Sequence, residues 1–316
     1  LEIARGDLPK ARTRLDALLA RRDLPRGTVN RLRGLRMAAA ENAAELARFA
    51  ARTPLGVSYG FDGNELPDEV TDDPQLQAYA AGRPAFDADA AWTLNRRLPL
   101  AAWLALANDA RLDAELQRRI AVAGWVRAAL LDDESAVAFA ARAGALAPEL
   151  ALSLAAVAAA PPAERRFASV LLLLRQPGLG PFVRPGLGRT TAAGELDEFR
   201  DNWWCDAANA GIARPEWYPD VAPAFLAPAE RKKTDDEWAR LAKLASAPTH
   251  LAAEAVAWGR AHPKDDRVPE ALHLAVRATR YGCTDARSSA QSKAAFQLLH
   301  RQYPKSEWAA KTKYFF

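Results

Sequence analysis

WGRAHPK at residues 258–264 and LHRQYPK at residues 299–305 are two copies of one turn phrase near the end of the chain. In each copy an aromatic ring, that of His262 or Tyr303, directly precedes a Pro-Lys pair. Proline ends a helix because it lacks an N–H donor. The two prolines are 41 residues apart, and helical repeats of that length are typical of stacked hairpins. The sequence therefore predicts an all-α fold of stacked helical hairpins forming an α-solenoid, interrupted by one long Gly, Pro and aromatic loop.

Composition supports the helical prediction. Half of the 316 residues are apolar, and alanine and leucine dominate them. Alanine has the highest helix propensity because it loses no side-chain entropy on ordering. Apolar residues recur at three and four residues on both sides of the loop, which predicts one continuous superhelix. We find no run of about 18 uncharged apolar residues, so we predict no transmembrane segment. Because residue 1 is Leu, we expect the chain to be processed or a fragment.

The closing segment resembles the tetratricopeptide-repeat (TPR) family, and most of all its bacterial periplasmic members. The residues that carry the likeness are Phe296, Leu299, Tyr303, Pro304, Ser306 and Ala309. Residues 6–19 are similar to another helix of that kind. The chain departs from the family in lacking its ordered Trp, Leu-Gly and Tyr signature, and 41 residues exceeds the usual repeat of about 34. The resemblance implies a partner-binding scaffold and supplies no catalytic residues.

The patterning predicts five segments. Residues 1–52 form an N-terminal TPR-like hairpin that continues a repeat array cut off upstream, with a second helix running to about Ala51. Residues 53–73 form an acidic loop containing a short strand within 55–61 and a turn at 62–65. Residues 74–175 form a bundle of helical hairpins whose members restart at Pro99, Pro148 and Pro162. Residues 176–232 are an irregular Gly, Pro and Trp segment, and residues 233–316 are C-terminal TPR-like repeats.

Charge is distributed unevenly along the chain. Residues 1–36 carry a net charge of +6, whereas residues 62–89 carry −7. One interpretation is two solvated faces that attract one another. The other is a basic patch for nucleic acid or acidic lipid. We favour the first, and predict no nucleic-acid partner, because the basic stretch lacks aromatic residues that could stack on bases.

Aromatic residues gather in the irregular segment, at Trp203, Trp204 and Trp217. A folded loop that plugs the helical wall would explain them. So would an exposed platform for a sugar or a peptide, because an indole offers a stacking face and an N–H donor. The Gly-x-Gly pattern at 178–180 cradles phosphate only between a strand and a helix. No strand is expected before this pattern, so we interpret it as a structural linker. We therefore predict no cofactor.

Catalytic signals are sparse. The four histidines, His250, His262, His273 and His300, lack zinc-ligand spacing, so we predict no metal site. Residues 206–211, DAANAG, resemble an Ala-Tyr-Asn-Ala-Gly motif of lytic transglycosylases. The tyrosine is missing, however, and so is a Glu-Ser in a matching helix upstream. We therefore predict no catalytic residues and expect that the protein is not an enzyme.

Cys205 and Cys283 are the two cysteines, and each lies in an expected loop or turn. We predict that they form one disulfide, which favours a periplasmic or extracellular location; the alternative is two free thiols in a cytoplasmic protein.

The predicted function is a non-catalytic scaffold that binds a protein partner in a bacterial envelope or extracytoplasmic complex, as one subunit of a larger assembly. The alternative is a helical accessory domain of an enzyme that acts on cell-wall glycan. The residues expected to contact the partner are Trp203, Trp204, Trp217, Tyr303, Trp308, Tyr314, Phe315 and Phe316. The aromatic end of the chain is expected either to cap the last hairpin or to dock on another subunit.

Overall fold

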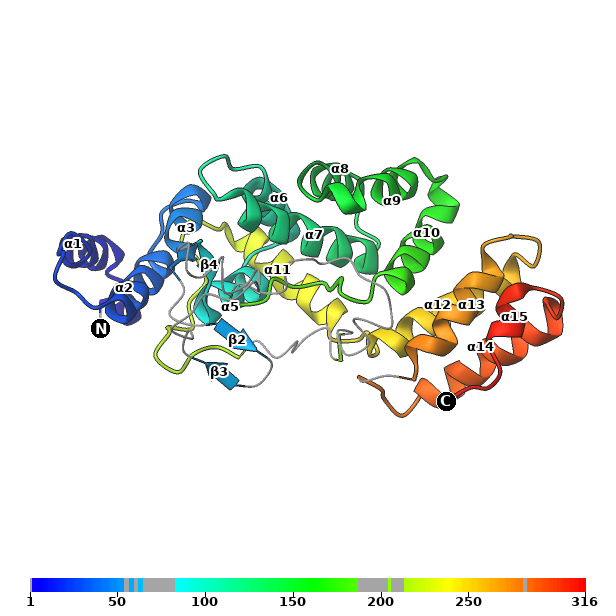
Figure 1. The fold of residues 1–316 in the computed structure, drawn as a ribbon. Coiled ribbons are helices and arrows are strands. Elements are labelled where there is room, and N and C mark those ends of the chain that lie inside the picture. Colours follow the sequence, from blue (N-terminus) through cyan, green and yellow to red (C-terminus); the bar gives the residue numbers. More distant parts are fainter. Residues whose placement is uncertain are drawn as a thin grey trace. The chain divides into compact units, whose positions relative to one another are not determined.

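Helices make up most of the chain in the computed structural model, as the composition predicts. The structure describes residues 2–53, 57–59, 62–64, 83–186, 204–205, 213–280 and 283–316. Within these ranges lie fourteen α-helices, one 3₁₀ helix and four strands of two or three residues (Figure 1). None of the described helices is long and apolar enough to cross a membrane.

The chain divides into two compact units, each assembled from three stretches of sequence. Unit 1 comprises residues 1–124, 182–190 and 211–238, and unit 2 comprises residues 125–181, 191–210 and 239–316. The first and last divisions fall within helix α7 (Ala114–Leu131) and helix α11 (Pro228–Leu241).

Unit 1 contains the N-terminal helices and the strands. Its elements are η1 (Ile3–Arg5), α1 (Leu8–Leu19), α2 (Arg26–Ala38), α3 (Ala43–Ala50), β1 (Ala51–Arg52), β2 (Val57–Tyr59), β3 (Asp62–Asn64), β4 (Ala85–Phe86), α5 (Ala88–Arg97), α6 (Leu100–Ala107), the first part of α7 and most of α11. Strand β1 pairs antiparallel with β4, and β2 with β3. The expected short strand is therefore β2. The expected turn at 62–65 is wrong for Asp62–Asn64, which form β3; the rest of the acidic loop lies largely outside the described residues.

The prediction of one long second helix that runs to about Ala51 is wrong, because the helix is interrupted at residues 39–42. Helix α2 ends at Ala38 and α3 begins at Ala43. Asn42 caps α3: its Oδ1 accepts from the backbone N–H of Glu45 at 2.9 Å. The Glu45 carboxylate accepts in return from the N–H of Glu41 at 2.9 Å. These side chains satisfy N–H groups that a helix start leaves without partners, so two short helices replace one.

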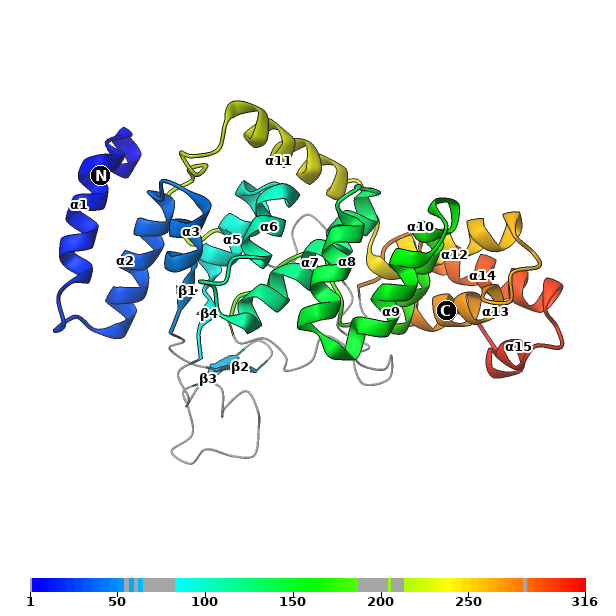
Figure 2. The same ribbon diagram turned by 90° about the horizontal axis from the view of Figure 1, so that it is seen from above.

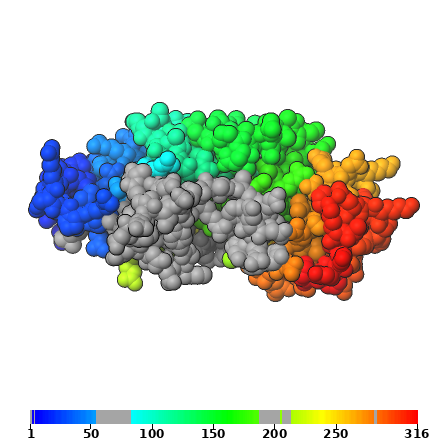
Figure 3. All heavy atoms as spheres, viewed as in Figure 1, coloured from blue at the N-terminus to red at the C-terminus, as the bar shows by residue number. Residues whose placement is uncertain are grey.

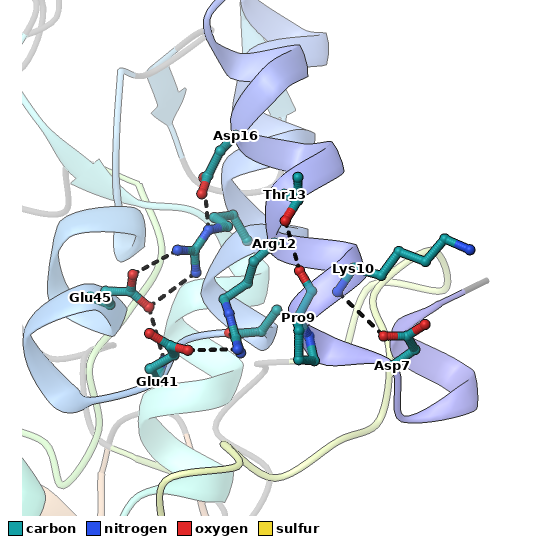
Figure 4. Close-up of polar contacts among 10 residues, drawn as sticks. Asp7, Pro9, Lys10, Arg12, Thr13, Asp16, Glu41 and Glu45 are labelled. Carbon is teal, nitrogen blue, oxygen red and sulfur yellow. Dashed lines mark hydrogen bonds and ion pairs between the residues drawn. The ribbon is translucent and has the colours of Figure 1, made fainter.

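Arg36 of α2 joins the first three helices. Its side chain is 5% exposed, and it donates to Asp16 of α1 at 2.8 Å and to Glu45 of α3 at 2.6 Å. Arg12 of α1 donates to Glu41, ahead of α3, at 2.6 Å (Figure 4). The hydrogen bonds from Arg36 hold the pKa of Glu45 below its ordinary value. These ion pairs help to hold the three helices together, because a buried guanidinium left without its carboxylate partners would be costly.

Unit 2 is built from helices packed in sequential pairs (Figure 2). After the end of α7 it contains α8 (Ala136–Leu146), α9 (Pro148–Ala159), α10 (Pro162–Arg175), α12 (Ala247–Ala261), α13 (Val268–Ala278), α14 (Ser288–Gln302) and α15 (Glu307–Lys311). Neighbours in sequence pack against each other, as in α8 with α9 and α12 with α13. Pro148 and Pro162 are each the first residue of a helix, as expected, because the first turn needs no N–H donor there.

The 41-residue repeat is present in the geometry of the C-terminal helices. Helices α12 and α14 have 15 residues each, and both their first and their last residues are 41 positions apart. At the end of α12 the N–H of His262 donates to Trp258 O at 2.8 Å, and Tyr303 donates equivalently to Leu299 O at 2.8 Å. Both turns therefore have the same hydrogen-bonded form, and the turn phrase read from the sequence predicts local structure correctly.

Candidate functional site

A groove in unit 1 combines apolar lining with the exposed tryptophan singled out from the sequence. It has a volume of about 580 Å³. Helices α1 and α2, which pack against each other, provide its apolar side through Ala11, Leu15, Leu18, Leu32 and Leu35. The segment before α11 provides the opposite side through Arg214, Glu216, Trp217, Tyr218 and Pro219, and Glu2, Ile3 and Arg14 complete the lining. Binding sites usually have volumes of about 300–1,000 Å³ and mainly apolar walls.

Several of the groove's apolar side chains remain in contact with solvent. Ala11 and Leu15 are buried, but Leu18, Leu32 and Leu35 are only half-buried. Trp217 is 38% exposed. Because about 25 cal/mol is gained for each Å² of apolar surface removed from water, a partner that covered these side chains would be bound favourably.

Trp217 is held in place by contacts with Arg31, Tyr218 and helix α2. The guanidinium carbon of Arg31 lies 5.3 Å from the ring centroid, and the Tyr218 ring meets the indole edge-on at 5.6 Å. Helix α2 approaches the indole at Gly34, where an added Cβ would lie 2.8 Å from Trp217 Cη2. The absence of a side chain at Gly34 therefore allows the indole to lie against the helix.

A buried polar cluster lies behind Trp217 and anchors this wall. The hydroxyls of Tyr218 and Thr93 are 2.9 Å apart, and Thr93 Oγ1 also donates to the backbone oxygen of Asp89. Arg52 donates to Asp89 Oδ2 at 2.8 Å, and the two side chains are 0% and 2% exposed. Burial raises the pKa of Tyr218 above its ordinary value, so its hydroxyl keeps its proton. The cluster connects β1, α5 and the segment that carries Trp217.

Asp87 gives this cluster a titratable carboxyl group. Burial raises its pKa to about 6. Arg52, whose Nε lies 4.0 Å from Asp87 Oδ2, lowers this pKa, and Asp89 raises it. A carboxyl group of that pKa exchanges a proton near neutral pH, which is a property of general acids and bases. Its described neighbours Arg52 and Asp89 are engaged in their own ion pair. The described residues around Asp87 therefore do not indicate a particular catalytic reaction.

The C-terminal aromatic residues predicted to contact a partner lie together in unit 2. Phe315 packs on Phe296 of α14 at 5.5 Å between ring centroids, and the N–H of Phe316 donates to Ser292 Oγ of the same helix. Tyr314 and Phe315 are 60% and 41% exposed. In the space-filling view the red C-terminal residues lie directly against the orange helices of this unit (Figure 3). The chain end thus folds back on the last hairpin and still presents aromatic surface.

The remaining predicted residues differ in their surroundings. Tyr303 donates from its hydroxyl to Pro263 O at 2.9 Å, which joins the two copies of the turn. Trp308 is half-buried, with its ring centroid 5.1 Å from that of His273. Trp204 is 2% exposed, so its ring belongs to the interior of unit 2. Trp203 and the DAANAG motif lie outside the described residues.

The predicted disulfide is present: Cys205 and Cys283 are bonded to each other. The backbone oxygen of the neighbouring Trp204 accepts from Ala247 N at 2.9 Å, at the start of α12. The bond therefore ties residues 204–205 to the C-terminal helices of unit 2. Elsewhere in the described part of the chain, no group of three or more His, Cys, Asp or Glu side chains could hold a metal ion.

His273 is the histidine whose surroundings are most unusual. It is 5% exposed, and its Nδ1 lies 2.7 Å from Thr312 Oγ1. That hydroxyl donates to Trp308 O, so it must accept from an Nδ1–H. Burial lowers the pKa of His273 to about 4, Arg277 and Lys311 lower it further, and Glu270 and Glu307 oppose them.

We expect unit 2 to lose stability in mild acid because of His273. The folded state binds this proton less readily than the unfolded chain, so the stability is complete above pH 6.5 and is lost as pH falls toward 4. Between pH 7 and pH 5 the free energy of unfolding should drop by about 2 kcal/mol through this group. Urea unfolding of His273→Gln should show a correspondingly flatter pH dependence. The exposed His262→Gln is the matched control, and equal pH dependence in the two variants would contradict the prediction.

Comparison of the chain with protein-family models, with curated proteins and with solved structures finds no match. Function must therefore be inferred from the geometry of the sites alone.

Sequence reasoning identified Trp217 but did not identify the groove around it. Leu18, Leu32 and Leu35 lie at helical spacing with the other apolar residues of α1 and α2, a pattern that usually indicates buried positions. A stripe that is buried and one that lines a groove look the same in sequence. The Arg52–Asp89 pair was also missed, because nothing in the sequence distinguishes a buried charged residue from an exposed one.

Proposed function

We propose that this protein is a non-catalytic helical scaffold that binds a protein partner, and that the groove of unit 1 receives an amphipathic helix of that partner. One observation carries the proposal: Leu18, Leu32, Leu35 and the 38% exposed indole of Trp217 line one groove. Binding hot spots are enriched in tryptophan that lies in a well-packed pocket.

The chemistry of the groove favours a helix over a polar small molecule. Its apolar side offers leucine and alanine side chains from two helices, which suits apolar residues spaced at i, i+3, i+4 and i+7 on a partner helix. Charges of both signs surround it: Arg14, Arg214 and Arg31 on one hand, Glu2 and Glu216 on the other. Such a mixed rim complements the charged flanks of an amphipathic helix and fixes its direction.

The repeated hairpins support the scaffold part of the proposal. Helices α12 and α14 lie 41 positions apart in the sequence, and each is followed by a shorter helix, α13 or α15, in an arrangement that resembles the hairpins of helical-repeat proteins. In our proposal such hairpins stack into a superhelix, and the chain acts as one subunit of a larger assembly. The disulfide supports a periplasmic or extracellular location, because such bonds persist mainly in oxidising compartments.

The experiment selects binding peptides and then tests whether they use the groove. A displayed library of peptides about 16 residues long, roughly four helical turns, would carry apolar residues at helical spacing. Selected peptides would be titrated calorimetrically into the protein. Trp217→Ala and Leu32→Glu should each weaken binding at least about tenfold, or 1.4 kcal/mol. Leu152→Ala is the matched control, since Leu152 is 88% exposed and lies in unit 2.

Two outcomes would count against the proposal. Selected peptides that bind Trp217→Ala as tightly as the unmodified protein would show that the groove does not receive them. Saturable binding of N-acetylglucosamine oligosaccharides, lost in Trp217→Ala while no peptide binds, would favour the glycan-binding alternative, because an exposed indole also stacks on sugar rings.

A further inference from the structure

The disulfide of unit 2 borders an open hollow at the surface. Cys205 is exposed, and Cys283 is half-buried. The hollow has a volume of about 370 Å³ and is lined by residues 242 and 244–246, which lie between α11 and α12, and by residues 285–287, which precede α14. Cys205 also lines it, and Cys283 does not. A molecule that enters the hollow therefore meets Cys205 before Cys283, so the two cysteines differ in their access to a reagent.

The backbone at Cys283 has a conformation that residues with side chains rarely adopt. Its φ angle is 41°, in the left-handed region that favours glycine. Among the described residues other than glycine, only Asp132 also has a positive φ. Such a conformation persists only where the surrounding structure enforces it. Breaking the disulfide removes one constraint on this backbone, which favours the release of the Cys283 sulfur.

Two charged side chains line the hollow, and they differ in their surroundings. The Asp285 carboxylate is half-buried and accepts from Ser246 N at 3.2 Å, from Ser246 Oγ at 3.1 Å and from Arg287 N at 2.8 Å. The Arg287 side chain, by contrast, is exposed. A neighbouring arginine stabilises a thiolate, which is the reactive form of a thiol. The more accessible charge at the hollow is therefore the one that favours an approaching thiolate.

We propose that Cys205 is a redox modification site, at which a small thiol such as glutathione enters the hollow and exchanges with the disulfide of the folded protein. The thiolate attacks Cys205 Sγ, and the bond to Cys283 breaks. The electron pair of that bond leaves on Cys283 Sγ, which takes up the proton that the attacking thiol gave up. Cys205 then carries the mixed disulfide. Attack of a second thiol on the external sulfur releases Cys205 and joins the two small thiols in a disulfide. The site is independent of the groove in unit 1 and of the partner proposed for it.

Mass spectrometry of the folded protein tests which sulfur is attacked. The unmodified protein would be incubated briefly with glutathione, quenched with acid, alkylated at its free thiols and mapped by peptides. We expect glutathione on Cys205 and the alkylating reagent on Cys283, with the Cys205 adduct in at least about tenfold excess, because access decides which sulfur is attacked. In concentrated urea the two adducts should form in similar amounts, since both sulfur atoms are then solvated.

The rate of exchange tests the route of attack. Ala286→Trp fills the hollow and should slow exchange about threefold or more, because the thiol must reach Cys205. Ala290→Trp is the matched control, since Ala290 is exposed on α14 and lies outside the hollow. Below the unfolding transition the rate should change little with urea. Exchange through the unfolded chain would instead accelerate steeply, because the free energy of unfolding falls linearly with denaturant.

Three results would overturn the inference. The first is equal labelling of the two cysteines in the folded protein, or an excess of adduct on Cys283. The second is exchange that appears only as urea unfolds the protein, because the disulfide would then be inaccessible to thiols in the folded state. The third is an equal rate in Ala286→Trp and Ala290→Trp, because the thiol would then not approach through the hollow.

Discussion

Replacing Arg52 by methionine is expected to lower the free energy of unfolding by about 3–5 kcal/mol, because the change leaves the buried Asp89 carboxylate without its partner. The Arg52 and Asp89 side chains are 0% and 2% exposed, and their Nη2–Oδ2 distance is 2.8 Å. No described group hydrogen-bonds to Arg52 Nε or Nη1. Water could not solvate the remaining carboxylate without opening the cluster, so the cost is far larger than for a surface pair.

A double-mutant cycle separates the pair from the packing around it. Arg52→Met and Asp89→Leu should each be strongly destabilising in urea unfolding. The double variant should lose much less than the sum, because it removes both charges of the buried pair together. Arg21→Met removes the exposed pair with Asp23 and should cause no measurable change. Additive losses in the cycle would show that the two side chains do not act together.

The Arg52→Met substitution should also change the surroundings of Trp217 in the groove of unit 1. The Asp89 backbone oxygen accepts from Thr93, whose hydroxyl contacts Tyr218, the neighbour of Trp217. We therefore expect a red shift in the tryptophan fluorescence of this variant while it is still folded. Arg21→Met should leave the emission unchanged.

Removing the disulfide is expected to have the largest effect on unit 2. The bond between Cys205 and Cys283 closes a span of 78 positions, which by chain entropy contributes about 4–5 kcal/mol as an upper figure. Cys205→Ser with Cys283→Ser should lower the denaturant midpoint substantially. Part of the loss reflects the unfolded chain, which gains freedom when the loop opens.

Reduction provides the control for this prediction. A thiol reductant should lower the denaturant midpoint of the unmodified protein toward that of the double serine variant, and it should leave the variant itself unchanged. Full alkylation of both cysteines without reductant would contradict the prediction, and it would also remove the main support for an extracytoplasmic location.

The helices illustrate what could be predicted from sequence and what was overlooked. Pro148 and Pro162 begin helices where expected, since proline acts on its own turn. The break before α3 was missed, although Asn42 followed three residues later by Glu45 is a recognisable capping signal. The apolar stripe on both sides of the break obscured it, because its spacing continues as if the helix did.

The sequence by itself determined the helical class, the repeated turn at His262 and Tyr303 and the cysteine pair available for a disulfide, because each depends on neighbouring residues or on residue type. Only the tertiary structure decided that Trp204 is buried while Trp217 is exposed, that Arg52 meets Asp89, and that Leu18 and Leu32 line a groove. The physical reason is that burial and charge pairing depend on segments brought together from distant positions. Identical residue types therefore acquire opposite roles.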